Sequence, residues 1–162
     1  MSTGMRKGLI VGLIHVALVA SLGAKLQMDR VTRPRVWAQT VPVDPDSPLR
    51  GRYVRLRVQV EPEGSPGLDY GLQRVSLVVH GQSLGFVLDP AGSGGWVRKM
   101  SNGPTVLDQP LAFFIPEHVP DPSIRQSGEE LWVEVTVPKA GAPRPIRLGV
   151  KKDGVITPLD LD

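Results

Sequence analysis

The chain has 162 residues, among them 18 glycines, 16 prolines and only eight aromatics, a composition that suits short strands and argues against a helical bundle. Three of the 19 basic residues precede Met28, and the remaining 16 balance the 16 acidic residues. The body of the protein therefore lacks the clustered positive charge that nucleic-acid binding requires. Cysteine is absent, which excludes disulfides, thiolate metal sites and a cysteine nucleophile.

A short basic N-terminus, residues 1–7, precedes an apolar segment over residues 8–28. As an α-helix rising about 1.5 Å per residue, this segment covers roughly 30 Å, the thickness of a bilayer core. We therefore expect a transmembrane helix that is retained as a signal anchor. The alternative is a cleaved signal peptide, with Ser21 and Gly23 as the small residues before the cleavage site and Ala24 as the new start.

The charges that flank this segment bear on its orientation. Arg6 and Lys7 precede it, whereas four basic residues lie at or beyond its end: Lys25, Arg30, Arg33 and Arg35. Positive-inside counting alone places the C-terminal region in the cytoplasm, but a basic-flanked N-terminal segment behaves as a signal, and large domains translocate with little regard for charge. We expect a single-pass protein of the bacterial inner membrane with its C-terminal domain in the periplasm.

Several residues of the apolar segment are candidate contacts to a membrane partner. Gly8, Gly12 and Ala20 lie on one helical row, and small residues on a row allow two helices to pack closely. His15 stands at mid-span, where an ionisable residue is a functional candidate. The competing interpretation is a neutral imidazole that hydrogen-bonds a neighbouring helix. Both interpretations indicate a partner in the membrane.

Residues 29–48 contain four prolines and show no apolar periodicity. Because proline fixes its own φ and constrains the residue before it, we expect an extended connector here. Residues 49–162 then form the folded domain. This segment predicts an all-β domain, an antiparallel barrel or sandwich of about seven or eight short strands.

The strand assignments depend on alternation and on turn residues. Val54, Leu56 and Val58 alternate with polar side chains and give one apolar face. Glycine-containing turns around Gly81 and at Asp153-Gly154 predict two hairpins. The expected strands cover residues 53–60, 75–79, 84–88, 95–100, 111–115, 131–137, 146–150 and 155–159.

The start of this domain, Gly51-Arg52-Tyr53-Val54-Arg55-Leu56-Arg57-Val58, resembles the Gly-Asp-Tyr-x-x-Leu-x-Tyr signature of the bacterial GDYXXLXY family. Arg52 and Val58 replace the aspartate and the second tyrosine. Phe113-Phe114-Ile115-Pro116-Glu117 resembles the family's aromatic strand ending in Pro-Glu. The family has no established activity. The resemblance implies a membrane anchor, a domain outside the cytoplasmic membrane, and a multi-spanning membrane protein as partner.

The motif residues have separate expected roles. Gly51 precedes the first strand, where freedom to adopt positive φ helps the chain to enter the sheet. Leu56 belongs to the apolar face and should be buried, whereas Tyr53, Arg55 and Arg57 share the outer face. That outer face is a candidate surface for an anionic lipid headgroup or an acidic partner, with Glu117 as a further interaction candidate. A plain solvated strand face is the alternative.

The remaining polar residues do not form a recognised catalytic or metal site. Glu117 and His118 are neighbours on an extended chain, so they point to opposite faces. His80 lies in a turn and has no second histidine at metal-ligand spacing. Asp44 and Asp46 offer too few oxygens for Ca²⁺.

The glycine-rich run Gly92-Ser93-Gly94-Gly95 has neither the lysine nor the helix of a phosphate-binding loop, and we expect a flexible loop. From these residues we expect no cofactor, no metal and no catalytic group.

The sequence accordingly predicts a non-enzymatic accessory or interaction subunit of a membrane assembly, with a small-molecule ligand left undefined. One alternative is a relative of the type I signal-peptidase fold, in which a serine lies about eight residues before the glycine; Val43 occupies that position here. Without the hydroxyl, a serine–lysine mechanism is lost. A cleaved, secreted β domain that binds a ligand is the third possibility.

Overall fold

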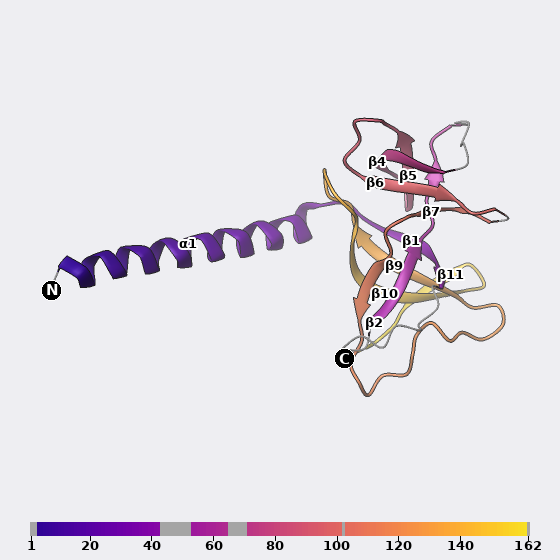
Figure 1. The fold of residues 1–162 in the computed structure, drawn as a ribbon. Helices are drawn as coiled ribbons and strands as arrows, with labels where there is room; N and C mark the ends of the chain where they lie inside the picture. The colour runs from indigo at the N-terminus through magenta and orange to yellow at the C-terminus, as the bar shows by residue number, and fades with distance from the viewer. Residues whose placement is uncertain (1–2, 43–52, 65–70, 102, 162) are drawn as a thin grey trace. The chain divides into compact units, whose positions relative to one another are not determined.

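The computed structural model describes residues 3–42, 53–64, 71–101 and 103–161 (Figure 1). These residues form two units, a helical unit that ends at Arg33 and a β domain that begins at Pro34. Gly51 and Arg52 of the motif, together with Val43, Asp44 and Asp46, lie outside the described residues.

The N-terminal unit is one α-helix, α1 (Thr3–Thr32). Its stretch from Lys7 to Asp29 is long and apolar enough to cross a membrane, and none of it is buried in the protein. Exposed leucine, isoleucine and valine side chains surround this helix, a pattern shared by membrane anchors and signal sequences. The expected apolar helix is confirmed, with five more helical residues at its N-terminal end and four more at its C-terminal end.

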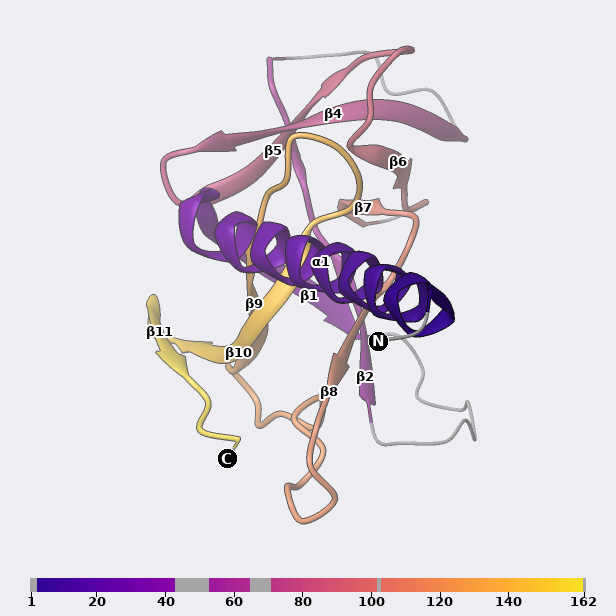
Figure 2. The ribbon, with the colours of Figure 1, turned by 90° about the vertical axis from the view of Figure 1, so that its left-hand side faces the viewer.

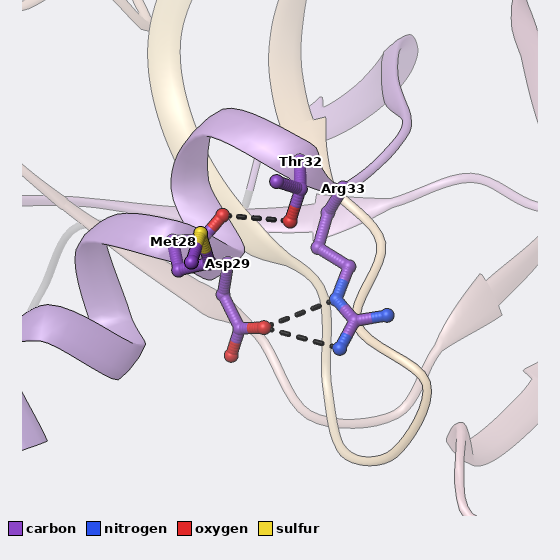
Figure 3. Close-up of polar contacts among 4 residues, drawn as sticks. All are labelled: Met28, Asp29, Thr32 and Arg33. Carbon is purple, nitrogen blue, oxygen red and sulfur yellow. Dashed lines mark hydrogen bonds and ion pairs between the residues drawn. The ribbon is translucent and has the colours of Figure 1, made fainter.

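Side-chain hydrogen bonds join residues at the C-terminal end of α1 (Figure 3), and a proline in the sequence ends the helix. Thr32 Oγ1 donates to the carbonyl oxygen of Met28 at 2.7 Å, and Arg33 Nε donates to Asp29 Oδ1 at 3.1 Å. Pro34 follows, and its ring disfavours the helical conformation at the preceding residue. Two residues, Arg33 and Pro34, therefore separate the helix from the first strand.

The β domain contains two sheets, which lie one above the other in Figures 1 and 2. The first has six strands in the order β11 (Val155–Pro158), β10 (Arg144–Lys152), β9 (Glu130–Thr136), β1 (Arg35–Pro42), β2 (Tyr53–Val58) and β8 (Leu111–Phe114). The second has five, in the order β3 (Glu61–Pro62), β5 (Ser83–Leu88), β4 (Leu72–His80), β6 (Gly95–Lys99) and β7 (Thr105–Leu107). The all-β prediction is confirmed.

Both sheets contribute side chains to one core. Leu56, Val133 and Leu148 from the first sheet and Phe86 and Val75 from the second are fully buried in one apolar cluster. The first sheet also curls, since Cα atoms of β8 and β10 approach within 8 Å although the strands are not neighbours. The pairs are antiparallel except for β3 and β5, which run parallel.

Strand β2 links the two sheets at its C-terminal end. Up to Val58 it pairs with β1, and the amide of Gln59 still donates to the carbonyl of Gln39 at 2.9 Å. Gln59 then bridges to Val106 of β7, and the amide of Val60 donates to the carbonyl of Thr105 at 3.0 Å. The chain thus passes from one sheet into the other without a loop.

The expected connector over residues 29–48 is corrected by the structure. Its first residues complete α1, and Arg35–Pro42 form β1, which lies between β9 and β2 in the middle of the first sheet. Pro34 and Pro42 bracket this strand rather than interrupt it. Proline is tolerated at strand ends, because the N–H that it lacks is not needed there for the hydrogen bonds between the central residues of paired strands.

The glycine-rich run is also corrected. Gly92 and Gly94 are buried against β4, and the amide of Gly94 donates to the carbonyl of Val75 at 3.0 Å. A Cβ at Gly92 would lie 2.5 Å from the backbone of Val75, and a Cβ at Gly94 would lie 2.7 Å from the amide nitrogen of Leu77. The glycines serve close packing of two backbones, and not flexibility.

Candidate functional site

The outer surface of β2 and β8 carries the motif residues that face solvent. We call it the β2–β8 face, defined by Tyr53, Arg55, Arg57, Ala112 and Phe114. The antiparallel register places Tyr53 opposite Phe114 and Arg55 opposite Ala112. Phe114 is 66% exposed and Tyr53 is 36% exposed. Two aromatic side chains therefore stand side by side in solvent next to an arginine.

Alternation along β2 explains this arrangement. Successive side chains of a strand point to opposite faces, so Val54, Leu56 and Val58 enter the core while Tyr53 and Arg55 remain outside. Leu56 has no exposed surface, as the sequence predicts. On β8 the same rule buries Leu111 and directs Phe113 against the core, which leaves Phe114 outside.

Arg57 differs from Arg55 in its surroundings. It is half-buried opposite Val41 of β1, and its Nε is buried without a hydrogen bond to any described residue. Glu117 is exposed in the segment that follows β8. The structure thus brings Tyr53, Arg55 and Arg57 together on one face and places Leu56 on the opposite one.

The candidate membrane-contact residues all lie on exposed parts of α1. An added Cβ at Gly8 or Gly12 would meet nothing within 4 Å, so a neighbouring helix has access to that row. Ala20 is likewise exposed. His15 Nδ1 lies 2.9 Å from the carbonyl oxygen of Val11, a contact within its own helix rather than to a neighbour.

The polar residues considered for chemistry are not gathered into a reactive site. His80 Nε2 pairs with Glu63 Oε1 at 3.2 Å, a carboxylate that only the fold brings near. Among the described residues, no group of three His, Asp or Glu side chains is arranged to hold a metal ion. The His80–Glu63 contact is exposed at the surface, where a polar side-chain contact of this kind contributes little to stability.

A second cluster, which was not predicted from the sequence, lies on the outer face of β1, β9 and β10. The guanidinium of Arg147 lies over the Trp37 ring at 5.5 Å from its centroid, and Arg147 Nε donates to Glu134 Oε2 at 2.6 Å. Lys151 Nζ lies 4.4 Å from the centroid of Trp132. The sequence shows the period-two alternation of Glu130, Trp132 and Glu134, which places them on one face of a strand. It does not show the register between strands, which brings the cations over the rings.

Comparison of the chain with protein-family models, with curated proteins and with solved structures gave no match. The chemistry of the β2–β8 face is therefore the guide to function. Aromatic residues and arginine are enriched at protein–protein interfaces, where a few residues, often Trp, Tyr or Arg, supply most of the binding energy. The face offers contact area and charge, which is what a binding surface requires.

Proposed function

We propose that the protein is a membrane-anchored accessory subunit that binds another membrane protein through its β2–β8 face and performs no chemistry of its own. The observation that carries the proposal is the exposed Tyr53–Phe114 pair beside Arg55. An aromatic pair left in solvent costs free energy that burial against a partner recovers, at about 25 cal/mol for each Å² of apolar surface. The arginines favour an acidic rim on that partner.

The location of the subunit follows from α1. We place the protein in the bacterial inner membrane as a single-pass protein with the β domain in the periplasm. The apolar stretch Lys7–Asp29 supports the span, and the signal-like character of a basic-flanked apolar segment supports the orientation, against the count of positive charges. The resemblance to the GDYXXLXY family supports a multi-spanning protein as the partner, with Gly8, Gly12, His15 and Ala20 as contacts in the membrane.

The orientation predicts the outcome of a fusion experiment. Alkaline phosphatase joined after Asp162 should be active, because the enzyme matures only outside the cytoplasm. The control is a cytoplasmic reporter at the same position, which should be inactive. An inactive phosphatase in a stable, full-length fusion would place the β domain in the cytoplasm.

The partner surface is tested by photo-crosslinking in intact cells. A photoreactive amino acid at Phe114 should yield one discrete adduct with a membrane protein, because that side chain stands on the proposed interface. The matched control is Val87 on the second sheet, which is 38% exposed and should yield no such adduct. The same adduct from both positions, or an adduct from Val87 alone, would contradict the assignment of the β2–β8 face.

A further inference from the structure

A cavity of about 290 Å³ lies where β2 passes from the first sheet into the second. Its apolar surface includes the buried residues Ala38, Val60 and Leu84, which come from three different segments. The lining also includes two tryptophans and four polar residues, namely Trp37, Trp132, Gln39, Gln59, Glu61 and Ser83. The cavity volume is at the small end of the range for ligand sites, and an apolar lining with a few polar groups is typical of such sites.

Both tryptophan rings are fixed before any ligand arrives. Trp37 covers the backbone at Gly149, where an added Cβ would lie 2.8 Å from two ring atoms, and Arg147 lies over the ring. Trp132 Nε1 donates to Glu130 Oε2 at 3.0 Å, and Lys151 lies over that ring. Rings held by neighbouring strands lose little conformational entropy on binding, which favours affinity.

The charges near the cavity have both signs, one carboxylate and two cations, and do not favour an ion of either sign. Glu61 is exposed and repels an anion, and no lysine or arginine is among the described residues that line the cavity. Each tryptophan ring already carries a cation over its face, and that cation repels a second one. A neutral ligand is therefore favoured.

The polar groups offer donors and acceptors together. The amides of Gln39 and Gln59 provide both, the carboxylate of Glu61 accepts, and Ser83 Oγ donates to the carbonyl of His80 at 3.2 Å and keeps its lone pairs for a ligand. A proline-rich peptide supplies hydrogen-bond acceptors but few donors, so the carboxylate of Glu61 would receive no hydrogen bond from it. A sugar supplies hydroxyl groups of both kinds and an apolar C–H face that packs on an aromatic ring.

We propose that this cavity binds one ring of a neutral sugar. Trp37 and Trp132 supply the apolar contact, while Gln39, Gln59, Glu61 and Ser83 hydrogen-bond the hydroxyl groups. The site is independent of the proposed partner surface, because it lies at the C-terminal end of β2 and the Tyr53–Phe114 pair lies at the N-terminal end.

The test uses the full chain in phosphatidylcholine nanodiscs, because glycoside detergents would compete for the site. A Trp96→Phe background leaves Trp37 and Trp132 as the fluorescent reporters. Titration with glucose and with N-acetylglucosamine should give a saturable change in tryptophan fluorescence for one or both. Glucuronate and protonated glucosamine, which carry the excluded charges, should bind more weakly than their neutral counterparts.

Substitution of two residues of the lining tests whether the sugar binds in the cavity. Gln59→Ala and Glu61→Ala should each raise Kd about 2- to 10-fold, the effect of one lost hydrogen bond. Tyr53→Ala should leave Kd unchanged. Glu61 is exposed, so its variant remains informative if Gln59→Ala fails to fold. The proposal is overturned by no saturation with either neutral sugar, by saturation that ignores both variants, or by saturation with a proline-rich peptide alone.

Discussion

Leu56→Ala should lower the free energy of unfolding by about 2–5 kcal/mol, the usual cost of truncating a buried leucine. Leu56 has no exposed surface and lies in the shared core, on a strand that pairs with both β1 and β8. Its truncation removes apolar contacts and leaves a cavity that rigid strands cannot close. Chemical denaturation of the full chain in a mild detergent, followed by far-ultraviolet circular dichroism, measures the change.

Arg55→Ala is the matched control for Leu56, because it changes the next residue of the same strand on the opposite face. Its side chain is exposed, so its loss should alter stability by no more than about 0.5 kcal/mol. Equal destabilisation by the two variants would mean that β2 does not present its apolar face to the core. That result would also remove the basis for the outward direction of Tyr53.

Gly92→Ala should destabilise the β domain by about 1–3 kcal/mol or more, although it adds only one methyl group. The new Cβ would lie 2.5 Å from the carbonyl carbon and oxygen of Val75, and backbone atoms of a paired strand cannot move aside cheaply. Thermal melts of the variant and the parent chain give the shift in Tm.

Ser93→Ala is the control for the glycine run, because it changes the residue between the two buried glycines. Ser93 is exposed, and its hydroxyl makes one long hydrogen bond to the carbonyl of Lys139 at 3.3 Å. Its Tm should stay close to that of the parent chain. An unchanged Tm for Gly92→Ala as well would show that the loop is loose, as the sequence alone suggested.

Local patterns predicted the hairpins and the two faces of β2. Asp153 and Gly154 adopt positive φ, 51° and 81°, which is the conformation that a tight turn requires and that these residue types tolerate. The alternation from Tyr53 to Val58 likewise fixed which side chains enter the core. In both cases the information lies within a few residues of the chain.

Strands whose identity depends on distant partners were not predicted. The inward side chains of β1 include Ala38 and Thr40, which give little apolar contrast, and Thr40 Oγ1 finds its partner in the carbonyl of Leu131 at 2.8 Å. Strand β7 has three residues, all buried, so it shows no alternation. Strand β3 has two and pairs in parallel with β5.

The β2–β8 face was predicted only in part, because it too depends on strands that are distant in the sequence. Alternation placed Tyr53 and Arg55 outside, but the pairing of Tyr53 with Phe114 requires the register between β2 and β8, which are separated by many residues. The tryptophan-lined cavity combines five segments of the chain, and no motif marks it. Sites assembled from separate strands become visible only when the sheet order is known.

The intact mass of the chain recovered from alkali-washed membranes shows whether α1 holds the β domain at a membrane. Alkali removes peripheral proteins and leaves proteins with a spanning helix in the pellet. We expect the chain in the membrane pellet, with residues 1–28 still present. A soluble chain that begins near Ala24 would show instead that the apolar segment is a cleaved signal peptide.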